Sequence, residues 1–159
     1  MATKAEAGLA KIEAAVGTTE GTGDWFTVDQ DLINLFAGAT HDHQWIHVDP
    51  ERCAEMSPWK APIAHGFLTL SMLTHLSASI ARDPAPFEGV VMGVNYGFDK
   101  VRFVTPVKVG SRVRATSVLA DAKLKDPNSV QVTRTMTVEI EGEAKPALVA
   151  DWLTMVVYG

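Results

Sequence analysis

The chain has 159 residues, 47% of them hydrophobic and 21% charged, so it can bury one sizeable core but is too short for two full domains. Fourteen basic residues against 19 acidic ones give a formal net charge of -5, which would repel a nucleic-acid backbone. A single cysteine, Cys53, excludes an internal disulfide and a thiolate metal cluster and is typical of a reducing compartment. The most apolar stretch, Ala61–Ile80, contains two histidines and several hydroxyl residues, which argues against a membrane span. We therefore expect one domain over residues 1–159, located in the cytoplasm, without nucleic-acid or membrane partners.

The part of the chain before Gly89 has apolar residues at helical intervals. Residues 1–22 predict an N-terminal extension with a short surface helix. Capping-box spacing at Thr27–Gln30, followed by periodic apolar residues, predicts a helix from about Asp29 to Thr40. The segment Gly66–Ile80 is rich in leucine and has no Lys, Arg, Asp or Glu before its end, so it predicts a helix that is buried nearly all round.

The part of the chain after residue 89 alternates between apolar and polar residues, most clearly at Val130–Ile140. Further long strands are expected at about Val90–Phe98, Ser111–Lys123 and Ala147–Tyr158, separated by turn-forming residues. One buried helix before a run of antiparallel hairpins predicts an α+β fold, in which a curved antiparallel sheet wraps around the helix. Such an open sheet leaves edge strands, which favours pairing of two copies into a homodimer.

The densest cluster of polar side chains, His41–Pro50, directly follows the first predicted helix and contains three of the five histidines. Because a helix ends before it and Pro50 interrupts regular structure, we expect these residues on a loop or on irregular turns. A carboxylate and an imidazole a few residues apart supply one group that is ionised at neutral pH and one that titrates near it. Such a pair suits acid–base chemistry on a single water molecule.

Two other interpretations of this cluster stay open on spacing alone. In the first, Asp42 caps a turn, His47 is a partly buried histidine with a satisfied hydrogen bond, and His41 and His43 are simply exposed. In the second, His41, His43 and His47 hold a metal ion together with His65, although no recognised ligand spacing is present.

The second feature of interest is Ala61–Phe67, where a proline-containing loop enters the buried helix through Gly66. The N–H of Gly66 can approach a ligand closely and, aided by the helix dipole, stabilise negative charge on an oxygen. The alternative is that Gly66 only permits close packing at the start of the helix.

The hydroxyl residues of this helix lack the Gly-x-Ser-x-Gly setting of a nucleophile, and Cys53 has no catalytic signature, so covalent catalysis is not expected.

Two strings, Phe36–Pro50 and Ile63–Gly66, resemble the MaoC-like dehydratases, in particular the nodulation protein N-like branch, which includes a 3-hydroxyacyl-thioester dehydratase. The family consists of hot-dog-fold, (R)-specific enoyl-thioester hydratases. The resemblance runs from about Trp25 to Tyr158 and also covers Val94–Gly97 and Lys100–Val113. It therefore implies a hot-dog fold for this chain.

The resemblance also implies roles for individual residues. Asp42 and His47 occupy the places of a catalytic Asp and His that lie five residues apart in the family's motif. The backbone N–H of Gly66 corresponds to the donor to the thioester carbonyl, and His65 and Thr74 fall at substrate-binding positions. Two places depart from the pattern: the residue before the Asp is usually Gly and is His41 here, and the common Asn-Pro is Gln44-Trp45.

The activity implied by this resemblance is reversible hydration of a trans-2-enoyl thioester to the (R)-3-hydroxyacyl thioester, without metal or redox cofactor. The substrate would be carried on coenzyme A or acyl carrier protein, and Lys100, Arg102 or Arg112 would meet the phosphates of coenzyme A. Two other functions stay open. The first is a hot-dog acyl-CoA thioesterase, and the second is a non-catalytic acyl-thioester binding protein, which the change to His41 favours.

Overall fold

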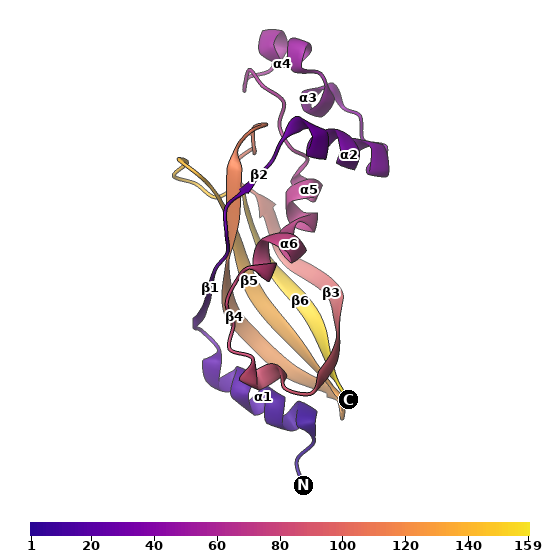
Figure 1. Cartoon of the computed structure of the whole chain (residues 1–159), viewed down its shortest axis with the longest axis vertical. Helices are drawn as coiled ribbons and strands as arrows, with labels where there is room; N and C mark the ends of the chain where they lie inside the picture. Colours follow the sequence, from indigo (N-terminus) through magenta and orange to yellow (C-terminus); the bar gives the residue numbers. More distant parts are fainter.

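The structure, a computed structural model that describes residues 1–159, is built on one antiparallel sheet (Figure 1). Its four long strands are β3 (Val90–Phe103), β4 (Arg112–Asp126), β5 (Ser129–Ile140) and β6 (Leu148–Tyr158). They lie in the order β4-β5-β6-β3, and the short strands β1 (Thr19–Thr22) and β2 (Phe26–Thr27) both pair with β4. The strand β3 therefore forms one edge of the sheet. The predicted antiparallel hairpins are confirmed for β4, β5 and β6, but β3 pairs with β6 rather than with β4, the next strand in the chain.

The strand β3 continues five residues beyond the expected end at Phe98. The pairing of β3 with β6 shifts register between Asp99 and Arg102, where Lys100 has a φ of 52°. This irregularity accommodates the extra residues, so pairing resumes and ends only at Phe103.

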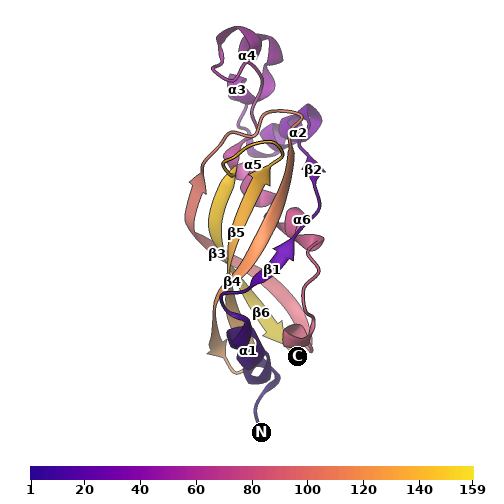
Figure 2. The same cartoon turned by 90° about the vertical axis from the view of Figure 1, so that its left-hand side faces the viewer.

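The expected helix Gly66–Ile80 is present as two short helices, α5 (Gly66–Ser71) and α6 (Leu73–Ala78), which lie on one face of the sheet (Figures 1 and 2). They join at Met72, whose backbone keeps right-handed helical angles. Leu68, Leu73 and Leu76 are buried in the main core, but Phe67 is 66% exposed. The expectation of burial nearly all round is therefore wrong for the single chain, because the sheet covers only one side of these helices.

Three helices project beyond one end of the sheet: α2 (Gln30–Thr40), α3 (Trp45–Val48) and α4 (Pro50–Met56). The predicted position of α2 is confirmed, but its cap is Asp29, whose carboxylate accepts a hydrogen bond from the Leu32 N–H at 2.9 Å. The chain leaves α2 through His41, which has left-handed backbone angles.

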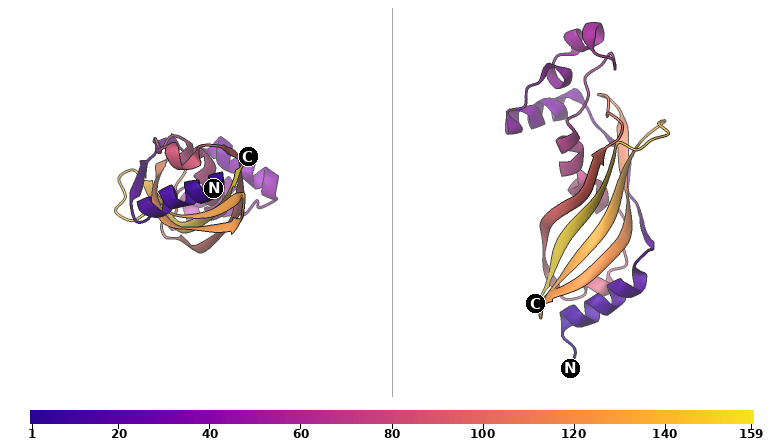
Figure 3. Two further views of the ribbon diagram at one scale, coloured as in Figure 1. Left: turned by 90° about the horizontal axis from the view of Figure 1, so that it is seen from below. Right: turned by 180° about the vertical axis from the view of Figure 1, so that it is seen from behind.

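The helix α1 (Lys4–Ala15) crosses the opposite end of the sheet, near both termini (Figure 3). It buries Ala5 and Ile12 in a second apolar cluster formed with β4, β5 and β6. The expected N-terminal extension, residues 1–22, thus holds α1 and also β1, which belongs to the sheet. The 3-10 turn η1 (Ala85–Phe87) packs beside α1 and accepts a hydrogen bond from the buried Tyr158 hydroxyl at Pro86. No helix of the chain has both the length and the apolar character needed to cross a bilayer.

Candidate active site

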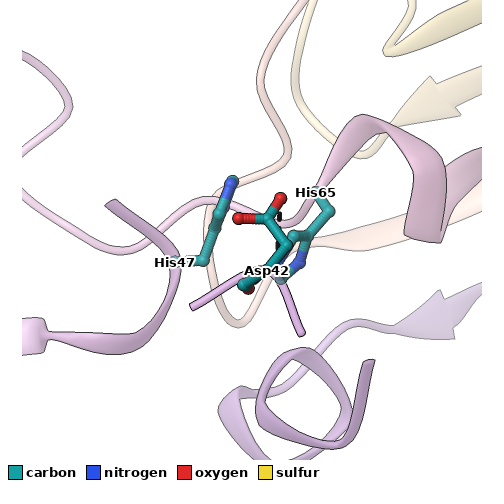
Figure 4. Close-up of side chains that lie close together, drawn as sticks. All are labelled: Asp42, His47 and His65. Atoms are coloured by element: carbon teal, nitrogen blue, oxygen red, sulfur yellow. Dashed lines mark hydrogen bonds and ion pairs between the residues drawn. The ribbon is translucent and has the colours of Figure 1, made fainter. Parts of the chain in front are cut away.

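Three side chains from two segments of the chain converge where the projecting helices meet α5 (Figure 4). Asp42 lies in the turn after α2, His47 on α3, and His65 at the residue before α5. One ligand atom from each lies within 4.8 Å of the others. Asp42 lies in an irregular segment, as expected. His47 instead lies on the one-turn helix α3. Pro50 does not disrupt this helix, because Pro50 comes after it and is the first residue of α4.

The imidazole of His47 is buried and fixed by one hydrogen bond. Its Nδ1 lies 2.6 Å from the carbonyl oxygen of Ile63, and because a carbonyl only accepts, Nδ1 carries the proton and Nε2 keeps a lone pair. Burial is the main cause that lowers the pKa of His47, and the charge of His65 lowers it further. The hydrogen bond to Ile63 and the charge of Asp42 raise this pKa by less. At neutral pH His47 is therefore a neutral base whose free nitrogen is Nε2.

His65 contacts both other members of the group. It is only 3% exposed, and its Nε2 donates a hydrogen bond of 2.9 Å to the backbone oxygen of Asp42. Its ring stacks on that of His47, with 3.8 Å between centroids and 23° between planes, and the Phe36 ring also packs against the His65 ring, with 5.0 Å between centroids. His65 therefore holds the backbone at Asp42 and the ring of His47 in a fixed relation.

The carboxylate of Asp42 is the open member of the group. Its side chain is 51% exposed, and its Oδ1 accepts a hydrogen bond from the N–H of Gln44 at 3.3 Å. The Oδ2 atom lies 3.9 Å from His65 Nε2. A carboxylate with solvent access beside a buried neutral imidazole leaves room for a water molecule that contacts both groups.

A cavity of about 260 Å³ adjoins His47 and Gly66. Gly66 is the first residue of α5, so its N–H has no acceptor within the helix. A Cβ atom at this position would meet the Phe103 ring at 2.8 Å, which explains why glycine is required for close packing here. Gly66 and His47 line the same cavity, so the position of Gly66 suits both close packing and a hydrogen bond to a ligand.

The other residues singled out from the sequence lie apart from this group. Thr74 lines two different cavities between α6 and the sheet. Lys100 pairs with Asp151, Arg102 donates to its neighbouring carbonyl, and Arg112 pairs with Glu141.

A metal ion is a chemical alternative for the group, since one carboxylate and two imidazoles offer ligand atoms within 4.8 Å. The structure joins His47 and His65 with Asp42, whereas His41 and His43 are exposed and do not belong to the group. Each of the two buried rings already bonds a backbone carbonyl through one nitrogen, which leaves one nitrogen per ring for a ligand. Loss of activity on chelation would identify a metal enzyme.

Comparison with known proteins identifies the family. Residues 11–141 match the family described as the MaoC like domain. The chain belongs to the MaoC-like family. It is 49% identical over 150 residues to nodulation protein N of Rhizobium meliloti, with 94% of this chain and 91% of that protein covered. It is 50% identical over 143 residues to 3-hydroxyacyl-thioester dehydratase Z of Mycobacterium tuberculosis, with 90% and 91% covered.

Solved structures share the MaoC-like fold. The monoamine oxidase regulatory protein from Archaeoglobus fulgius is 26% identical, has a TM-score of 0.72, and covers 91% of each chain. The (R)-hydratase from A. caviae is 22% identical with a TM-score of 0.67, over 87% of this chain and 94% of that one. The expected hot-dog fold is confirmed, and the family and its named relatives place this MaoC-like chain among the hydro-lyases.

The left-handed backbone at His41 predicts a gain in stability when this residue is changed to glycine. With φ at 60°, the side chain adds strain that glycine avoids, so His41→Gly should raise the free energy of unfolding by about 1 kcal/mol. His43→Gly is the matched control, since its φ is not positive and glycine there only adds freedom to the unfolded chain. Urea unfolding measures both variants, and equal changes in the two would contradict the prediction.

The lowered pKa of His47 predicts acid sensitivity of the fold. Between the ordinary value of 6.5 and the lowered value, the unfolded chain binds more protons than the folded one. The free energy of unfolding should therefore fall as pH falls through this window and level off below the folded-state pKa. Urea unfolding against pH should show a smaller decrease in His47→Gln than in the wild type. His43→Gln, at an exposed position, should follow the wild type, and a decrease in His47→Gln equal to that of the wild type would refute this assignment.

Proposed function

We propose that this MaoC-like chain catalyses the reversible, (R)-specific hydration of a trans-2-enoyl thioester to a 3-hydroxyacyl thioester. The observation that carries the proposal is that the Asp42 carboxylate lies within 4.8 Å of the His47 imidazole, which lines the same cavity as Gly66. The name of the mycobacterial relative, a 3-hydroxyacyl-thioester dehydratase, supports the same reaction read in the reverse direction.

In the proposed mechanism, Asp42 and His47 hold one water molecule between them. The water oxygen adds to C3 of the enoyl group, one member of the pair takes a proton from the water, and one delivers a proton to C2. Nε2 of His47 has a lone pair because Nδ1 donates to Ile63, and the Asp42 carboxylate accepts the second hydrogen bond of the water. The two groups act as one coupled acid–base pair.

The proposed role of Gly66 concerns the thioester oxygen. Addition of water at C3 places enolate charge on this oxygen, and the N–H at the start of α5 would donate to it. One such preorganised donor is worth about 2.7 to 4 kcal/mol of transition-state stabilisation. With this donor and the acid–base pair, the proposed reaction uses no metal or redox cofactor.

The proposed substrate is an acyl thioester of coenzyme A or acyl carrier protein, which places the enzyme in fatty-acid metabolism. The apolar residues of the cavity, among them Ile63, Val104 and Val107, suit the hydrocarbon next to the thioester.

We further propose a homodimer that forms through the edge strand β3. Several large apolar side chains of β3 are exposed in the single chain, including Val91 at 69% and Tyr96 at 61%. A long edge strand with such residues is a pairing site for a second copy. Light scattering should give a dimer for the wild type and a monomer for Tyr96→Asp, while Leu124→Asp on β4 stays dimeric. A wild-type monomer would exclude this arrangement.

The experiment that tests the function follows crotonyl-CoA by the loss of enoyl-thioester absorbance, with free thiol measured in parallel. We expect loss of absorbance without release of thiol. Release of thiol would identify the thioesterase, and binding of acyl-CoA without any turnover would identify the non-catalytic module.

A further inference from the structure

A second cavity, of about 450 Å³, lies between α6 and the strands β3, β5 and β6. Much of its wall is apolar, as at Val94 and Val156, but Arg82 and Arg134 also line it. The side chain of Arg134 is only 10% exposed. Buried cations in an apolar wall are costly unless anions pair with them, so the charges around this cavity matter.

One carboxylate serves both cations. Oε2 of Glu20 lies 2.9 Å from Nε of Arg134 and 3.3 Å from Nε of Arg82. Burial alone would raise the pKa of Glu20, but Arg134, the hydrogen bond from Ser117 and Arg82 together hold this pKa below its ordinary value. Glu20 is therefore ionised, and two positive charges against one negative charge leave an excess of one positive charge.

Two buried nitrogen atoms of residues that line this cavity also lack a hydrogen-bond acceptor, although the Arg82 side chain as a whole is 23% exposed and its Nη1 donates to the Ser77 carbonyl at 3.0 Å. Trp152, which is 8% exposed and lines the cavity, has no hydrogen-bond partner for its Nε1. Nε of Arg82 forms no aligned hydrogen bond despite its short distance to Glu20. A buried donor without an acceptor is destabilising, so both nitrogens favour an oxygen ligand in the cavity.

Further cavities lie along α6 and α5 between this cavity and the candidate active site. A third cavity, of about 300 Å³, shares Thr74, Asn95 and Trp152 with it and reaches Leu70 on α5. On the same helix, Gly66 lines the cavity of His47. Thr74 lies eight positions after Gly66, a rise of about 12 Å along α5 and α6, which an extended acyl chain of about ten carbons spans.

We propose that the cavity between α6 and β3 binds a carboxylate at the distal end of the acyl chain, with Arg82 and Trp152 as its donors. A carboxylate supplies the missing negative charge and has the planar shape that guanidinium groups pair with, whereas a methyl end would leave Nε of Arg82 and Nε1 of Trp152 without a hydrogen-bond acceptor. Only the position of the thioester end, at Asp42 and His47, rests on the function proposed above. The substrate class is thus a thioester of a medium-chain dicarboxylic acid.

The test compares two saturated ligands by titration calorimetry, so that no turnover is needed. The first is the mono-CoA thioester of a dicarboxylic acid of about ten carbons, and the second is the CoA thioester of the monocarboxylic acid of equal length. The wild type should bind the first about tenfold to a hundredfold more tightly, as hydrogen bonds to a charged group imply. Arg82→Gln and Trp152→Phe should each reduce this ratio, with melting temperatures confirming that the variants are folded.

Arg114→Gln is the matched control, because it removes an equal charge at a partly exposed site on β4 that does not line the cavity and where the guanidinium pairs with Glu139. Its affinity ratio should equal that of the wild type. A wild-type ratio near one, no detectable binding of either ligand, or a ratio that survives both cavity substitutions would overturn the proposal. Because the ligands are saturated, a failure to hydrate crotonyl-CoA would count against the proposed function alone.

Discussion

Replacing Asp42 by Asn is expected to lower kcat/KM for hydration of crotonyl-CoA by about 10²- to 10⁴-fold, the usual contribution of a positioned acid–base group. The amide of Asn keeps an oxygen that accepts from the Gln44 N–H, and the side chain at this position is half exposed. The fold should therefore be unchanged, and the loss should come from the missing carboxylate. Steady-state kinetics together with thermal melting measure the two effects separately.

The control for Asp42 is His43→Asn, which changes an exposed side chain of the same segment that lies outside the group formed with His47 and His65. Its kcat/KM should equal that of the wild type. If Asp42→Asn retained most of its activity, the carboxylate would not be part of the acid–base pair, and the interpretation that Asp42 only shapes a turn would be correct.

Gly66 offers a test of the backbone donor, because proline at the first position of a helix removes an N–H that the helix does not use. His65 has a φ of -58° and a ψ of 136°, angles that suit a residue before proline. Gly66→Ala keeps the N–H but adds the same Cβ atom against the Phe103 ring. The pair of variants therefore separates the loss of the donor from the steric effect.

Both Gly66 variants are best made with Phe103→Ala, which removes the ring that the new Cβ would meet at 2.8 Å. In this background, kcat of the Pro variant should lie about 10²- to 10³-fold below that of the Ala variant. Equal values of kcat would show that Gly66 serves packing only and that the thioester oxygen has another donor.

The sequence predicts the part of the site that lies in one short segment. Asp42 and His47 are five residues apart, so local spacing and family resemblance both identify them. The resemblance also names His65, but local spacing does not, because its contacts with Asp42 and His47 depend on the start of α5 packing against the turn after α2. No periodicity or spacing encodes such a contact, which arises only when the segments pack together.

The predicted burial of the Gly66–Ile80 helix is wrong because burial on all sides would need a second covering surface besides the sheet. The absence of charged residues from Gly66 to Ile80 predicted a helix buried on all sides, yet Phe67 and Thr74 are exposed. A single sheet covers one side of α5 and α6, and the apolar edge of β3 lies open in the single chain. A segment without charged residues indicates that its surface is covered, but the sequence does not show whether the same chain or a second copy covers it.

The most direct test of the central claim is the dehydration of the two enantiomers of 3-hydroxybutyryl-CoA, followed by the appearance of enoyl-thioester absorbance. We expect crotonyl-CoA to form from the (R) enantiomer alone, and the reaction to be lost in Asp42→Asn. Dehydration of the (S) enantiomer, or no reaction of either enantiomer with folded protein, would contradict the assignment of this chain as an (R)-specific hydratase.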